Sequence, residues 1–172
     1  MKKRQQGMTT VEAAIGGVLM MIMLFGTIEI ARAIFVWNFL DEVTRRGARV
    51  AAVCPIDTTD NSVAKRVAIF APPGGPNQSP HVNELSTDDL DLEYIDASGA
   101  TKTAPVFEEV KFVRVSIPSF ELPLLFFNTL TWTTPDFRTI LPSESLGYNP
   151  QDGVCNCFGE DPTYILGDDR CG

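Results

Sequence analysis

Residues 13–40 read AAIGGVLMMIMLFGTIEIARAIFVWNFL, a stretch in which only Glu29 and Arg32 are charged. A helix of about 20 apolar residues crosses the hydrocarbon core of a bilayer. Glu29 and Arg32 lie three positions apart, so on a helix they face each other and partly neutralise one another. The stretch therefore predicts a helix with a membrane part at about residues 13–39 and a transmembrane Glu29–Arg32 pair.

The composition limits what the rest of the chain can do. The chain has 172 residues, with 14 Lys and Arg against 22 Asp and Glu and a net charge of −8. An acidic chain without a basic stripe argues against nucleic acid as a partner. The sole histidine, His81, is expected to be exposed without a special role, and no phosphate loop, nucleophile elbow or acid–base pair is present. We therefore predict a protein that is not an enzyme and needs no cofactor or metal.

The residues before the apolar stretch predict its orientation. Residues 1–7 contain Lys2, Lys3 and Arg4 and no acid, which places the N-terminus in the cytoplasm and the remainder outside it. Three fates of the segment remain open. It stays as a single-pass anchor, it is cut by signal peptidase after Ala33 to release a secreted, disulfide-stabilised binding domain, or it is cut on the cytoplasmic side of the apolar stretch.

The third fate has the most specific signal, because Gly7 is followed by Met8-Thr9-Thr10-Val11-Glu12. This arrangement resembles the class III signal of type IV pilins and pseudopilins, which a prepilin peptidase cuts after the glycine. The resemblance implies cleavage between Gly7 and Met8, and it implies that Glu12 pairs with the Met8 amine of a neighbouring subunit. The alternative is that Glu12 only closes a capping box with Thr9 or lies near the lipid headgroups.

Three further segments narrow the resemblance. Residues 11–14 (VEAA), 24–32 (LFGTIEIAR) and 46–52 (RGARVAA) look like the TadE-like minor pilins of the tight-adherence (Tad) pilus. The resemblance implies a structural subunit of the bacterial inner membrane that joins, primes or caps a pilus, and so reaches the cell surface. It implies other pilin subunits, the prepilin peptidase, the inner-membrane assembly platform and membrane lipid as partners. Ala13 departs from the pattern, since major Tad pilins have a tyrosine there and TadE-like proteins often a phenylalanine. The missing tyrosine argues against the main fibre subunit.

The long helix is expected to continue beyond the membrane. Apolar or small residues recur at spacings of three and four, which is typical of one helical stripe: Leu40, Val43, Gly47, Val50 and Cys54. Pro55 ends the helix. With the cleavage that the resemblance implies, residues 1–7 are expected to be a basic leader cut off after Gly7, and residues 8–54 a long helix.

The remaining segments predict a fold of the α+β class, with an extracytoplasmic head over residues 55–145 and about three antiparallel strands. A short helix is expected at residues 63–70, capped at residues 60–62. The strands are expected at residues 90–94, at 106–117 with Val113, Val115 and Ile117 on one face, and at 129–140 with a break near Pro135. The apolar residues 123–127 are expected to pack into the head, the alternative being a patch that docks a partner pilin.

All four cysteines lie on the predicted extracytoplasmic side: Cys54, Cys155, Cys157 and Cys171. An even number in that compartment predicts two disulfides. Cys155 and Cys157 are too close to pair comfortably, so we favour Cys54 with one of them and Cys171 with the other. A four-thiolate zinc site is the weaker alternative, since C-x-x-C pairs are missing. Residues 146–172 form an acidic tail without the spacing of a calcium loop.

Overall fold

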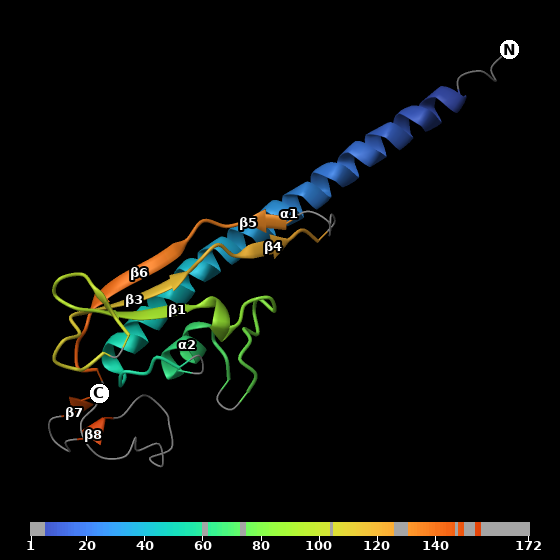
Figure 1. The fold of residues 1–172 in the computed structure, drawn as a ribbon. Helices are drawn as coiled ribbons and strands as arrows, with labels where there is room; N and C mark the ends of the chain where they lie inside the picture. Colours follow the sequence, from blue (N-terminus) through green and yellow to red (C-terminus); the bar gives the residue numbers. More distant parts are fainter. Residues whose placement is uncertain are drawn as a thin grey trace.

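The computed structural model describes residues 6–59, 62–72, 75–103, 105–125, 131–146, 148–149 and 154–155. One long helix, α1, spans Gln6–Val53, and a small α+β head lies along its C-terminal half (Figure 1). The predicted helix and the α+β class are confirmed. Because α1 begins before Thr9, this threonine is inside the helix and is not its N-cap.

The two halves of α1 have different surroundings. Every residue from 9 to 28 is exposed, whereas the head covers one face of the helix from Glu29 onward. On the covered face, Val36 is 3 % exposed, and Leu40 and Val43 are fully buried, at the spacing that the sequence predicts. The uncovered half has the length and composition of a membrane-crossing helix.

A four-stranded antiparallel sheet forms the centre of the head, in the order β2-β1-β3-β6. Its strands are β1 (Asp91–Ile95), β2 (Thr101–Lys102), β3 (Phe112–Ile117) and β6 (Phe137–Pro142). The predicted strands at 90–94, 106–117 and 129–140 correspond to β1, β3 and β6, and β2 is an addition. The strand predicted from residue 106 starts only at Phe112, because residues 107–109 form a turn.

Two short strand pairs accompany the main sheet. The pair β4 (Glu121–Pro123) and β5 (Thr131–Thr133) is a separate hairpin, and β7 (Tyr148–Asn149) pairs with β8 (Val154–Cys155). The predicted break near Pro135 is confirmed, since it separates β5 from β6. A short 3-10 turn at Thr87–Asp89 precedes β1.

The short helix α2 (Val63–Ala68) is two residues shorter than predicted. Ser62 caps its first turn by accepting a hydrogen bond from the Lys65 amide, whereas residues 60–61 of the predicted cap lie outside the described residues. Phe70 adopts a φ of 61°, and the amide of Ala71 donates to the carbonyl of Arg66. This left-handed residue with a six-residue hydrogen-bonded ring is a Schellman motif, which ends the helix before Phe70.

The core lies between α1 and the sheet. Val113, Val115 and Ile117 of β3 are at most 2 % exposed, which confirms the predicted buried face. The neighbouring helix α2 buries the small residues Ala64 and Ala68 against α1. Small side chains at this crossing let the two helices approach closely.

Gly47 is the closest point of this packing. A Cβ atom on Gly47 would lie 3.0 Å from the Ala68 Cβ and 3.3 Å from the Val115 Cγ1. The glycine of the predicted stripe is therefore a spacer between α1, α2 and β3.

We predict that Gly47→Val lowers the free energy of unfolding by about 1–3 kcal/mol, the usual cost of overpacking a core. Gly26→Val is the matched control, because a Cβ at Gly26 meets nothing within 4 Å. Denaturant unfolding in detergent, followed by circular dichroism, measures both. Equal stability of the two variants would contradict the spacer role.

Candidate functional site

Glu29 and Arg32, the charged pair of the apolar helix, lie where the head first contacts α1. The Arg32 Nη2 atom is 3.6 Å from Glu29 Oε1, and the two side chains are 23 % and 17 % exposed, respectively. The residues therefore face each other, as their spacing predicts. They are the first two partly buried residues of α1 after the fully exposed segment at residues 9–28.

The backbone at the end of β4 and just after it contacts both charges. The Leu125 amide donates to both carboxylate oxygens of Glu29, each at 3.2 Å, and the Arg32 guanidinium donates to the Pro123 carbonyl. We call these four residues the hairpin clamp. Figure 1 shows the β4–β5 hairpin lying along α1 at this level. Sequence reasoning missed these contacts, although two charges in an apolar helix signal a need for partners.

The clamp compensates two partly buried charges. Glu29 and Arg32 face each other as opposite charges. In addition, Glu29 accepts a hydrogen bond from a backbone N–H, and Arg32 donates one to a backbone carbonyl. These contacts offset the cost of partly burying the two charges. Removing either charge would leave the other without its ionic partner, which is the costly case. The Arg32 Nε atom is buried and has no hydrogen-bond partner among the described residues.

Aromatic rings hold the hairpin against the helix beside the clamp. The Trp37 ring centroid lies 6.3 Å from that of Trp132 on β5 and 5.3 Å from that of Phe137 on β6. Edge-to-face and offset contacts of this kind add about 0.5–1.5 kcal/mol each beyond burial. The clamp and the ring contacts together fix how the hairpin sits on α1.

The apolar residues 123–127 do not all pack into the head as expected. Leu122, just before them, is 3 % exposed, but Leu125 is 60 % exposed. The amide of Leu125 points to Glu29, and its side chain remains on the surface. Phe126 and Phe127 lie outside the described residues.

The residues of the predicted cleavage and assembly site lie at the other end of α1. Gly7 and Met8 belong to its first turns, and Glu12 is exposed. The Glu12 carboxylate has no ion-pair partner among the described residues. Seventeen residues separate Glu12 from Glu29, about 26 Å along a helix, so the structure does not bring these carboxylates together.

The cysteines are only partly within the described residues. Cys54 is 3 % exposed and takes part in a disulfide, whose partner sulfur lies outside the described side chains. Cys155 is in β8, and Cys157 and Cys171 lie outside the described residues. The connectivity therefore stays a prediction.

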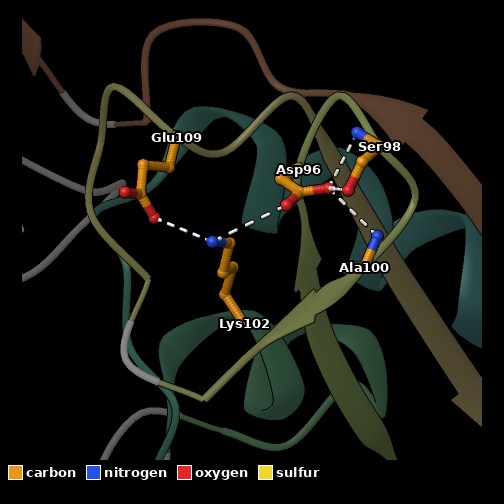
Figure 2. A network of polar contacts seen from close by, with 5 residues as sticks. All are labelled: Asp96, Ser98, Ala100, Lys102 and Glu109. Carbon is orange, nitrogen blue, oxygen red and sulfur yellow. Dashed lines mark hydrogen bonds and ion pairs between the residues drawn. The ribbon is translucent and has the colours of Figure 1, made fainter.

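A second polar cluster lies at the turn between β1 and β2 (Figure 2). The Lys102 Nζ atom lies 3.6 Å from Asp96 Oδ2 and 3.2 Å from Glu109 Oε2, between the two carboxylates. The Ser98 hydroxyl and the Ala100 amide donate to Asp96 and lower its pKa to about 2. Hydrogen bonding and charge from Glu109, then Asp96, raise the pKa of Lys102.

This second cluster is a structural clasp. An ammonium group already occupies the space where a cation would sit, and the described residues contain no group of three or more potential metal ligands. His81 is exposed, as predicted, but its ring makes edge contacts with Phe39 and Phe70, each at 5.7 Å between centroids. It therefore closes an aromatic cluster of the head.

We predict that Glu29→Ala releases the β4–β5 hairpin. The variant removes the acceptor of the Leu125 amide and the ionic partner of Arg32, and hydrogen bonds to charged groups contribute about 1.5–3 kcal/mol. Amide hydrogen exchange of the peptide around Leu125, measured in detergent, should accelerate about tenfold or more. Glu42→Ala is the matched control, because Glu42 is an exposed glutamate of the same helix. Unchanged protection of the hairpin in the Glu29 variant would show that the clamp contributes nothing.

Comparison with known proteins adds one finding. The family model described as "TadE-like protein" matches residues 7–49, about a quarter of the chain. Neither the comparison with curated proteins nor that with solved structures yields a match. The matched segment starts at Gly7, includes Glu12 and the Glu29–Arg32 pair, and ends two residues after the Gly47 spacer. The predicted resemblance is thus confirmed over this segment, in which the N-terminal helix of the chain is similar to that of TadE-like proteins.

Proposed function

We propose that the chain is a minor pilin of a Tad-type pilus, cut by prepilin peptidase after Gly7 and then incorporated into the pilus, where it primes or caps the fibre. The observation that carries the proposal is the TadE-like match, because it begins at the glycine of the predicted cleavage signal and covers most of α1. A structural role requires no catalytic group, cofactor or metal.

The uncovered half of α1 supports this role. Residues 9–28 are all exposed in the isolated chain, and most of them are apolar. Such a surface needs lipid or the helices of other subunits around it. Before assembly the inner membrane supplies lipid, with the N-terminus in the cytoplasm and the head outside; after assembly, neighbouring pilin helices replace the lipid.

Glu12 is the proposed contact that aligns the subunits. It lies within this uncovered half and its carboxylate has no ionic partner among the described residues. Cleavage after Gly7 creates a free amine at Met8, whose pKa near 8 leaves it mostly protonated at neutral pH. An intersubunit pair between this amine and Glu12 removes the cost of an isolated carboxylate in an apolar surrounding.

The main alternative is a secreted domain released after Ala33. Against it, Ala33 is 9 % exposed and belongs to the core between α1 and the head. A cut at this position would also remove Glu29 and Arg32 from the hairpin clamp. A plain single-pass anchor is the second alternative, which keeps the clamp but also keeps the basic leader.

The mature N-terminus separates these three proposals. Intact mass and N-terminal sequencing of the protein from its native membrane should give a chain that starts at Met8. A start after Ala33 would support the secreted domain, and an intact Met1 would support the plain anchor. Either result would overturn the pilin proposal.

We predict that Glu12→Ala is cut normally but is lost from sheared pili, because the neighbouring amine then has no carboxylate to pair with. Immunoblots of the membrane and pilus fractions measure both steps. Glu42→Ala is the control, since it removes a glutamate from the head-covered half of the same helix and should still be incorporated. Normal incorporation of the Glu12 variant would exclude the pairing role.

A further inference from the structure

The exposed face of α1 changes character at one point. Large apolar side chains remain exposed well above Glu29: Ile30, Ile34, Phe35 and Trp37, at 62 %, 56 %, 54 % and 38 %. From Asn38 onward, large apolar side chains are no longer exposed on α1, and the exposed positions are polar or charged: Asn38, Glu42, Arg45 and Arg49. The apolar surroundings of the helix therefore extend beyond the charged pair and end near Trp37.

Counting residues along α1 shows how deep Glu29, Arg32 and Trp37 lie in a bilayer. Ala13 is the first residue after Glu12, and twenty residues at 1.5 Å each span about 30 Å, the thickness of the hydrocarbon core. This count ends at Arg32, so Glu29 and Arg32 lie at the outer edge of the hydrocarbon. Trp37 lies about 8 Å higher, within the headgroup layer, where tryptophan is enriched.

The hairpin clamp is at the same depth, and its hydrogen bonds suit that place. Non-helical backbone is tolerated at membrane depth only where its polar groups have partners. Here the Leu125 amide and the Pro123 carbonyl are bonded to Glu29 and Arg32. The charged side chains likewise need hydrogen-bond partners in lipid. The helix side chains and the hairpin backbone therefore supply each other's hydrogen bonds.

Two large apolar side chains of the hairpin are exposed near the clamp. Leu125 is 60 % exposed, and Trp132, next to Trp37, is 44 % exposed. Exposed apolar residues thus occur on both the helix and the hairpin at one level of the molecule. An aqueous surface would make this exposure unfavourable, whereas a lipid surface makes it favourable.

From these observations we infer that the β4–β5 hairpin is a second membrane-contacting element. Leu125, just after β4, enters the outer edge of the bilayer beside α1, and Trp37 and Trp132 lie among the lipid headgroups. The part of α1 within the hydrocarbon core is then residues 13–32, which is shorter than the membrane part at residues 13–39 that the sequence alone predicts. The head rests on the membrane at this edge. This inference requires only that α1 crosses a membrane, and it holds whether or not a pilus is built.

Depth-dependent fluorescence quenching tests the inference. The full chain, with Trp37→Phe and Trp132→Phe, receives Leu125→Trp and is reconstituted into phosphatidylcholine vesicles that carry bromine on their acyl chains. The indole at position 125 should show blue-shifted emission and lose most of its intensity to the brominated lipid, but little to aqueous iodide. Val106→Trp in the same background is the matched control. Val106 is 47 % exposed, in the turn before β3, at the end of the head away from Trp37. It should be quenched by iodide alone.

A milder variant guards against loss of the fold. With only Trp37→Phe, the native Trp132 should be quenched by lipid brominated near the headgroup. Water-like emission from tryptophan at positions 125 and 132, equal to that at position 106, would overturn the inference. If the protein then still stays on the vesicles in carbonate, the anchoring of α1 in the membrane is unaffected by this result. A second result would also overturn the inference. If position 125 is shielded from iodide only when other pilus subunits are added, and is not quenched by brominated lipid, its contact is a protein partner.

Discussion

The arrangement of helix and head depends on the two charges that interrupt the apolar helix. A lone charge in such a surrounding is costly, and a pair three residues apart on a helix relieves only part of the cost. Part of the remaining hydrogen-bonding capacity of Glu29 is met by the Leu125 amide, and part of that of Arg32 by the Pro123 carbonyl. The charges thereby add polar contacts between α1 and a hairpin that also meets the helix through the Trp37–Trp132 ring contact.

The clamp also divides α1 into two halves with different tasks. Below it, residues 9–28 offer an exposed apolar surface to the environment; above it, Leu40, Val43 and Gly47 pack against the sheet and α2. A helix of 48 residues could bend or rotate relative to a small head. Because the head is attached both through this core and through the clamp, the direction of the uncovered half is fixed relative to the head.

Local patterns predict much of this fold, and long-range contacts to the backbone do not. The helix, the buried face of β3 and the break near Pro135 follow from spacing and composition. The clamp joins Arg32 to a residue 91 positions away through a carbonyl that every residue possesses, so no side-chain signal marks the acceptor. The end of α2 was predicted too late for a related reason: Phe70 has the left-handed conformation that glycine usually provides.

Glu12 and Glu29 show how one residue type serves two ends of a helix. Glu29 is already bonded within its own chain, so moving the helix from lipid into a pilus would require no new partner for it. Glu12 has no ionic partner among the described residues, and in the proposed function its partner comes from the next subunit. At Glu29 the cost of an unpaired carboxylate is offset when the chain folds. At Glu12 it is offset only when the next subunit binds, so this cost favours assembly. A subunit built in this way enters a fibre with its head already oriented and with one polar contact left to make.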